Sequence, residues 1–274
     1  MRCRLGLGFD QTTLGNTGIT VSRLGLSATY RPGKSAIYSA LDAGLNYFFF
    51  YGFDTQMISV LRDITKGKRD TYTVATGAYN LLWFTPDIHR TLEKRLRQLR
   101  TDYIDVFLFL GVTRESHFSA NVREGLCRLR EEGKVRSIGI STHNRSLAGK
   151  LAAEGTLDVI MMRYNAAHRG AEQDIFPYLD RYNPGVVSYT ATCWRQLLRR
   201  PRGWPMGVPI PTASMCYRFA LTNPHVDVCM TAPSNINHLK ENLTSLRQGP
   251  LSDEEMAFMQ RFGDAVHQSS RWSW

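Results

Sequence analysis

The sequence predicts an α/β fold, a (β/α)8 TIM barrel with an N-terminal hairpin and an extra C-terminal helix. Eight short apolar runs alternate with amphipathic segments along the 274 residues. The runs are continuously apolar and rich in Val, Ile, Phe and Tyr, which is typical of parallel strands covered on both faces. The predicted strands span residues 24–29, 46–50, 72–76, 103–109, 135–141, 159–163, 185–189 and 226–231.

The segments between these strands have the periodicity of helices with one apolar face. In residues 88–99, isoleucine or leucine recurs at intervals of four, four and three residues. We expect Thr85 to be the N-cap of this helix and Pro86 its first residue. A last helix is predicted to begin at Ser252, where Glu255 completes a capping box.

Eight strand–helix units joined by right-handed crossovers close most simply into a barrel. A doubly wound sheet would use fewer strands and usually carries Gly-x-Gly-x-x-Gly after the first one, which this sequence lacks. The length and the 43% hydrophobic content suit one large core, so residues 1–274 are predicted to form a single domain. In such a barrel, functional residues lie on the loops that follow the C-terminal ends of the strands.

Charge, cysteines and hydropathy exclude several classes of protein. The formal net charge is +10, but most basic residues are spread along helices beside acids, and no known nucleic-acid-binding motif accompanies them. The five cysteines are scattered without a C-x-x-C pair, so neither a disulfide framework nor a metal site is expected. Without a membrane-spanning run or a signal peptide, we expect a cytoplasmic protein with no membrane partner.

Several segments resemble the aldo-keto reductases in order and spacing, and together they cover nearly the whole chain. They are residues 14–18 (LGNTG), 21–26 (VSRLGL), 42–48 (DAGLNYF), 103–110 (YIDVFLFL), 133–141 (GKVRSIGIS), 223–226 (NPHV) and 239–243 (LKENL). The resemblance implies NADP or NAD as cofactor and a small carbonyl compound as substrate.

The resemblance also exposes three departures from the family's catalytic residues. The family's aspartate, lysine and histidine positions fall on Phe49, Gly77 and Leu110. The family's Tyr-Gly pair falls on Tyr51-Gly52, with the preceding loop shortened by about three residues. Tyr51 would therefore be the proton donor, but without a lysine to lower its pKa from about 10. The alternative is that Tyr51 is only an aromatic wall residue.

Two other polar residues are candidate catalytic groups. Arg163 ends the sixth predicted strand and would supply the missing positive charge; a structural salt bridge to Glu172 or Asp174 is the alternative. His168 follows the same strand and would replace the absent histidine as a donor. Asp54 is expected either to act near Tyr51 or to cap the following helix.

The cofactor positions are partly retained. Ser141 matches the family's serine that binds the nicotinamide carboxamide, and Tyr189 matches the aromatic residue on which the nicotinamide ring stacks. The asparagine and glutamine expected with them are Thr142 and Met161. On the adenosine side, the predicted binding residues are Ser234, Asn235, Glu241 and Asn242.

Residues 194–205 carry four arginines interleaved with tryptophans, on a loop at the predicted functional face. A phosphate clamp or a site for an anionic substrate is the favoured interpretation; nucleic-acid stacking and a solvated loop are the alternatives. The pocket is expected to be strongly aromatic, through Tyr30, Phe49, Phe53, Tyr79, Trp83 and Trp194.

Two functions remain open, with nucleic-acid binding ranked last. The first is carbonyl reduction by a reductase with altered acid–base residues. Such a protein can still catalyse the reaction, because holding the hydride donor close to the carbonyl in the reactive orientation supplies much of the rate acceleration. The second is a non-catalytic protein that binds a nucleotide or another ligand on the same barrel. The sequence leaves the substrate, the choice of NADP or NAD and the oligomeric state undetermined.

Overall fold

The computed structural model describes residues 8–80 and 86–269. The strands are β1 (Gln11–Thr13), β2 (Thr20–Ser22), β3 (Leu24–Ser27), β4 (Tyr47–Phe49), β5 (Thr73–Tyr79), β6 (Ile104–Val112), β7 (Val135–Thr142), β8 (Val159–Arg163), β9 (Gly185–Tyr189) and β10 (Val228–Thr231). The helices are α1 (Lys34–Asp42), α2 (Thr55–Lys68), α3 (Ile88–Leu99), α4 (Ala120–Glu131), α5 (Arg145–Glu154), α6 (Ala171–Asp174), α7 (Ala213–Thr222), α8 (Ile236–Gln248) and α9 (Asp253–Ser269).

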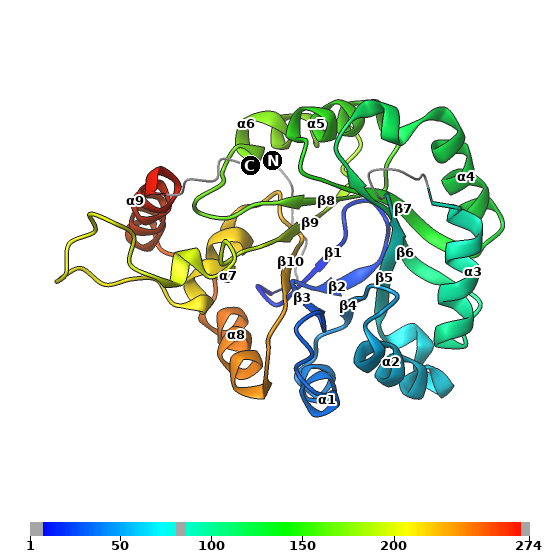
Figure 1. Cartoon of the computed structure of the whole chain (residues 1–274), viewed down its shortest axis with the longest axis horizontal. Helices are drawn as coiled ribbons and strands as arrows, with labels where there is room; N and C mark the ends of the chain where they lie inside the picture. The colour runs from blue at the N-terminus through cyan, green and yellow to red at the C-terminus, as the bar shows by residue number, and fades with distance from the viewer. Residues whose placement is uncertain (1–7, 81–85, 270–274) are drawn as a thin grey trace.

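Strands β3 to β10 form a closed parallel barrel, in which β10 pairs with both β3 and β9. Helices surround the barrel, and α9 lies outside this ring beside α7 (Figure 1). The predicted TIM barrel, hairpin and extra helix are therefore confirmed. Strands β8 and β9 have the predicted bounds, and the other six differ by one to three residues at their ends.

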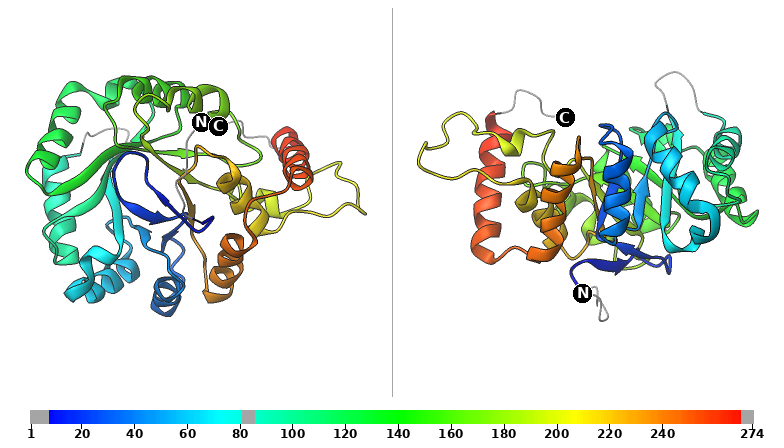
Figure 2. Two further views of the ribbon diagram at one scale, coloured as in Figure 1. Left: turned by 180° about the vertical axis from the view of Figure 1, so that it is seen from behind. Right: turned by 90° about the horizontal axis from the view of Figure 1, so that it is seen from below.

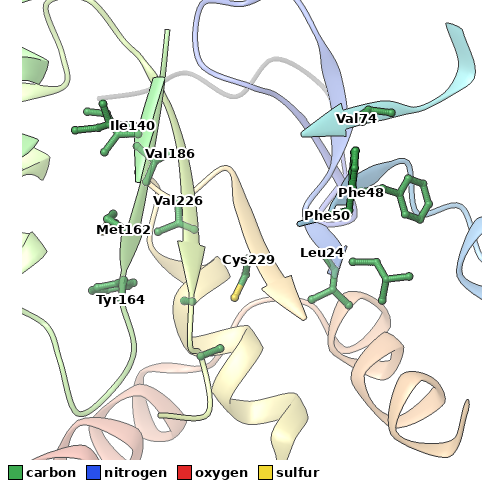
Figure 3. Packing of buried hydrophobic residues seen from close by; sticks show 14 of the residues in the cluster. Leu24, Phe48, Phe50, Val74, Ile140, Met162, Tyr164, Val186, Val226 and Cys229 are labelled. Carbon is green, nitrogen blue, oxygen red and sulfur yellow. The ribbon is translucent and has the colours of Figure 1, made fainter. Parts of the chain in front are cut away.

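The core has two layers, because side chains alternate between the two faces of each barrel strand. Outward-facing residues such as Phe48 and Ile140 (Figure 3) belong to one buried apolar cluster with helix residues such as Leu92. Inward-facing residues such as Tyr47 and Val106 fill the barrel itself. The inner layer leaves room only at an end of the barrel.

The β1–β2 hairpin closes the N-terminal end of the barrel (Figure 2). Leu14 and Val21 from the hairpin are fully buried and belong to the inner layer. Gly15 has a φ of +51°, and a Cβ there would meet the backbone nitrogen of Gly185 at 2.2 Å. The hairpin can lie this close to β9 only because residue 15 has no side chain. A ligand that binds inside the barrel would therefore enter at the opposite, C-terminal end of the strands.

The start of α3 corrects one prediction. Thr85 lies outside the described residues, and α3 begins at Ile88 with Asp87 as its N-cap, so Pro86 precedes the helix. The Asp87 carboxylate accepts a hydrogen bond of 2.8 Å from the Arg90 backbone N–H. A carboxylate is an efficient acceptor at this position and also complements the helix dipole, which places the helix start after Asp87.

The predicted capping box at the start of α9 is confirmed. The Ser252 N–H donates to Glu255 Oε2 at 2.9 Å, and the Glu255 N–H donates to Ser252 Oγ at 3.2 Å. Glu255 also pairs with the nearly buried Arg218 of α7 at 2.7 Å, which fixes α9 to the barrel helices. Among the described residues, no helix is both long and apolar enough to cross a membrane.

Asp105 at the start of β6 is the most buried carboxylate in an ion pair of the described part of the chain, with a side chain 2% exposed. It accepts hydrogen bonds from Arg69 Nη2 at 2.6 Å, from the Val74 N–H at 2.8 Å and from Arg136 Nη1 at 3.2 Å. The carboxylate thus joins β5, β6, β7 and the end of α2.

We predict that Asp105→Ala lowers the free energy of unfolding by about 3 kcal/mol, because it leaves the largely buried Arg69 guanidinium without its carboxylate counter-ion. Chemical denaturation monitored by circular dichroism measures the change. The matched control is Glu115→Ala, whose pair with Lys150 is exposed and should not move the midpoint. Equal midpoints for the two variants would contradict this role of Asp105.

Candidate active site

A cavity of about 270 Å³ lies at the C-terminal end of the barrel. All eight barrel strands contribute to its lining, with residues at or near their C-terminal ends. These residues are Ser27, Phe49, Tyr79, Gly111, Ser141, Met161, Tyr189 and Met230, one from each of β3 to β10 in order. A larger hollow of about 570 Å³ lies on the outer surface beside α3 and Lys134, away from these strand ends. The strand-end cavity is the candidate active site, as the barrel rule predicts.

Phe49, on which the family's aspartate position is predicted to fall, lines this cavity, whereas Gly77 and Leu110 are not among its lining residues. Phe49 and Leu110 are 2% and 3% exposed and belong to the inner apolar layer. At Gly77 of β5, a Cβ would meet the Leu108 carbonyl oxygen at 1.9 Å. A lysine at residue 77 is therefore incompatible with the present spacing of β5 and β6. Phe49 and Leu110 therefore contribute apolar surface inside the barrel.

Tyr51 lines the cavity from the loop after β4, and its neighbours hold it in one orientation. Its ring stacks on Phe53 at 5.3 Å with an interplanar angle of 5° and meets Phe49 edge-on at 5.0 Å. Its backbone N–H donates to Asp54 Oδ2 at 2.8 Å. Burial, followed by Tyr79 and Asp54, raises the pKa of the Tyr51 phenol above its usual value. The phenol therefore keeps its proton and can donate a hydrogen bond, but it is a weaker acid than free tyrosine.

Asp54 has a role that the sequence left open. It occupies the N-cap position of α2, yet its side chain makes no capping bond to the helix. Its carboxylate instead accepts the Tyr51 backbone N–H. Asp54 therefore acts on Tyr51 by fixing the loop that carries it.

The opposite wall, from β7 and β9, is polar. The Tyr189 hydroxyl donates to the Thr142 carbonyl at 3.1 Å and lies 3.3 Å from His143 Nδ1. Ser141 lowers the pKa of the Tyr189 phenol, while burial, the largest effect, raises it. Partial burial and the charge of Arg163 lower the pKa of His143, which keeps its imidazole neutral at pH 7. The two positions predicted to hold the nicotinamide, Ser141 and Tyr189, therefore face the same cavity as Tyr51.

Arg163 and His168 lie near this wall but do not line the cavity. Arg163 is 7% exposed and faces inward with Met161, pairing with Tyr189 along the β8–β9 ladder. The two acids considered as its salt-bridge partners have other partners, since Glu172 accepts from the Tyr164 hydroxyl and Asp174 pairs with Arg145.

The His168 imidazole is engaged elsewhere. Its Nδ1 lies 3.2 Å from Asn165 Oδ1, and its ring meets the His267 ring of α9 edge-on at 5.5 Å. Burial and then Arg163 lower the pKa of His168 to about 4. The histidine that lines the cavity is instead His143, which follows β7. The sequence pattern that indicates this position is the alternation of side chains along β7. Because Ser141 faces inward, His143, two residues later, is expected to face inward as well.

The loop after β9 is held in a strained conformation next to the cavity. Cys193, Trp194 and Arg195 are three successive non-glycine residues with φ between +49° and +70°. The fully buried Asn165 donates to the Thr190 carbonyl at 2.8 Å and anchors the base of this loop. Such strain is retained where the surroundings enforce it, and here it places Trp194 in the cavity wall.

The arginine-rich loop does not form one continuous cluster. Trp204 packs edge-on against Phe262 of α9 at 4.8 Å, and Arg200 donates to the Pro205 and Val208 carbonyls. These two side chains therefore stabilise the loop itself. Arg195, Arg199 and Arg202 are exposed and remain candidates for binding an anion.

The predicted adenosine-side residues lie at and along α8. Asn235 caps this helix by accepting the His238 N–H at 2.9 Å, and the Ser234 hydroxyl lies 2.9 Å from His238 Nδ1. Glu241 is exposed. Asn242 is 5% exposed and donates to Thr231 Oγ1 at 2.8 Å, so its amide N–H already fixes α8 to β10.

Several solved structures have the same fold. Aldo-keto reductase AKR11C1 from Bacillus halodurans, in its holo form, has 21% identity and a TM-score of 0.78 over 93% of this chain and 97% of that one. An aldo/keto reductase from Klebsiella pneumoniae, in complex with NADP and acetate, has 22% identity and a TM-score of 0.73 over 91% and 94%. At these identities the similarity supports the fold alone.

Sequence comparison assigns the family. The uncharacterized oxidoreductase YqkF of Bacillus subtilis is 23% identical over 90% of this chain and 94% of its own length. Aldo-keto reductase YhdN of the same bacterium is 26% identical over 67% of this chain and 62% of its own length. The model of the aldo/keto reductase family matches residues 33–197, which is more than half of the chain and includes Tyr51, Ser141 and Tyr189. The chain therefore belongs to the aldo/keto reductase family of oxidoreductases.

Proposed function

We propose that this protein reduces a carbonyl compound with NADPH or NADH, using Tyr51 as the donor to the carbonyl oxygen. The observation that carries the proposal is that Tyr51, Ser141 and Tyr189 line one cavity at the mouth of the barrel. A phenol, a hydroxyl and a flat ring thus surround a space suited to a nicotinamide ring and a small substrate. The Klebsiella relative, which is bound to NADP, supports the choice of cofactor.

The residues present fit a nicotinamide nucleotide at both ends. Ser141 would bind the carboxamide group and Tyr189 would support one face of the ring. The start of α8, with Ser234 and Asn235, would bind phosphate through N–H groups that lack partners within the helix. The exposed Glu241 would contact the adenosine, while Asn242 would act mainly by holding α8 in place. The bound cofactor would supply the hydride.

The chain's own residues would handle the proton. Tyr51 would donate a hydrogen bond to the carbonyl oxygen and transfer its proton as negative charge develops there. Arg163 would stabilise that negative charge through its positive potential at the cavity wall, rather than by contact. The neutral His143 would offer a second donor on the opposite wall. His168 would hold Asn165 and the β9 loop in place.

The second candidate function is binding without turnover. The apolar residues at Phe49 and Leu110, and the tight strand spacing at Gly77, favour it because they remove the family's charged groups. The two functions differ in one measurable property, the oxidation of NADPH by an added aldehyde or ketone.

We predict NADPH oxidation with at least one member of a carbonyl panel, followed by the loss of absorbance at 340 nm. Tyr51→Phe removes the donor and should lower kcat by about 100-fold. Tyr178→Phe is the matched control, because Tyr178 is a 49% exposed tyrosine outside the cavity lining, and it should keep full activity. Binding of NADPH without oxidation by any substrate would favour the second function instead.

The pH dependence tests the state of Tyr51. Because the pKa of Tyr51 is raised above 10.0, the phenol stays protonated throughout the neutral and mildly alkaline range. We therefore expect no appreciable loss of kcat from ionisation of this group below about pH 9, one unit under the usual phenol pKa of 10.0. Steady-state kinetics at saturating NADPH measure the profile. An alkaline decrease in kcat below that pH, absent in Tyr51→Phe, would show that another group lowers the pKa.

A further inference from the structure

The loop that carries Tyr51 is held by helix α3 as well as by Asp54. Helices α2 and α3 lie side by side outside the barrel (Figure 1), and the loop after β4 leads into α2. Arg95 and Gln98 of α3 are only partly exposed, and both contact Gly52, the residue that follows Tyr51. A helix that contributes no residue to the cavity lining thus reaches the backbone beside the proposed proton donor.

The Arg95 guanidinium occupies the space that a side chain at residue 52 would need. A Cβ there would lie 2.0 Å from Arg95 Nη1, 2.2 Å from Cζ and 2.3 Å from Nη2. The φ of Gly52 lies outside the left-handed region, so its backbone conformation does not itself require glycine. Glycine is needed at residue 52 because it lets the guanidinium approach the loop backbone.

Gln98 completes this contact. Arg95 Nη1 donates to Gln98 Oε1 at 3.0 Å, and Gln98 Nε2 donates to the Gly52 carbonyl oxygen at 3.1 Å. On the other side of the loop, Asp54 accepts the Tyr51 N–H at 2.8 Å, and its own N–H donates to the Tyr51 carbonyl oxygen at 2.9 Å. Three backbone groups next to the Tyr51 side chain are therefore fixed, two by Asp54 and one by α3.

The burial of Arg95 is not explained by the stability of the fold. Loss of hydration lowers the pKa of its guanidinium, and its Nε is buried with no hydrogen-bond partner among the described residues. Within residues 8–80 and 86–269, no carboxylate forms an ion pair with Arg95. A partly buried cation without a counter-ion stabilises a fold little, or destabilises it. The contact with Gly52 therefore points to a role in placing Tyr51.

We propose that Arg95 and Gln98 are positioning residues for Tyr51, which hold Gly52 and so fix the phenol in the orientation from which it donates to the carbonyl oxygen. The catalytic part of this proposal rests on the proposed function, whereas the orientation of the Tyr51 ring can be measured without turnover. Orientation matters because a displacement of about 1 Å at the reacting groups can lower a rate by about 100-fold.

The orientation of the ring is tested by fluorine NMR on the full-length protein labelled with 3-fluorotyrosine. Among the 12 tyrosines, the Tyr51 signal is the one missing from Tyr51→Phe. Two aromatic neighbours of the Tyr51 ring shift this signal. We therefore expect Arg95→Met and Gln98→Glu each to move it toward its position in the unfolded protein. Lys94→Ala, at an exposed residue of the same helix, is the matched control and should leave the signal unchanged.

Gln98→Glu separates positioning from stability. A carboxylate at residue 98 can still accept from Arg95 and supplies its counter-ion, but it has no N–H to donate to the Gly52 carbonyl. We expect the denaturation midpoint of this variant to equal or exceed that of the wild type, while the Tyr51 signal is displaced.

The catalytic consequence is tested by kinetics with a carbonyl compound that the wild type reduces. Arg95→Met and Gln98→Glu should each lower kcat by about ten-fold. The dissociation constant of NADPH, measured by calorimetry, should change by less than about two-fold, because neither residue lines the cavity. In the Tyr51→Phe background, Arg95→Met should change kcat by less than about two-fold, because no phenol is left to position.

A Tyr51 signal that stays in place in both variants would overturn the proposal. A loss of kcat that is equally large in the Tyr51→Phe background would also overturn it, because a general structural defect acts in both backgrounds. A displaced signal with unchanged kcat would do the same. A displaced signal in a protein that oxidises NADPH with no carbonyl compound would contradict the proposed reduction, yet would support the placement of Tyr51 by α3.

Discussion

The alternation of side chains along the eight parallel strands is the constraint on which the site depends. Once the barrel closes and the hairpin fills its N-terminal end, a ligand inside the barrel can reach the inward-facing residues near the C-terminal strand ends and the loops that follow them. That inward set includes Phe49, Ser141, Met161 and Tyr189. The same alternation that builds the inner core therefore decides which chemical groups the cavity contains.

Because of this alternation, the strands that would bind the cofactor differ from the strands on which the predicted acid–base positions fall. On β7 and β9 the inward positions keep a hydroxyl and a flat ring, whereas on β4, β5 and β6 they are Phe49, Gly77 and Leu110. At Gly77 no side chain fits the present strand spacing, because the backbone of β6 occupies the space that a Cβ would need. Tyr51 thus acts, as proposed, in an apolar setting that keeps its proton bound rather than mobile.

The sequence predicted the parts of the structure that follow from local pattern. Continuous apolar runs located the barrel strands, and the spacing of Ser252 and Glu255 located the start of α9. It did not predict how polar side chains are used, because this depends on residues distant in the chain. His168 hydrogen-bonds Asn165 within its own loop, while His143 reaches Tyr189 across the mouth. The periodicity of the sequence does not indicate the hydrogen-bond partner of either histidine.

The most direct test of the account is a calorimetric titration of the full-length protein with NADPH, for the wild type and for Tyr189→Ala. The account predicts micromolar binding to the wild type and at least ten-fold weaker binding to the variant, because Tyr189 would support the nicotinamide ring. Wild-type protein that gives no heat of binding with either NADPH or NADH would contradict the claim that this barrel mouth is a nicotinamide site.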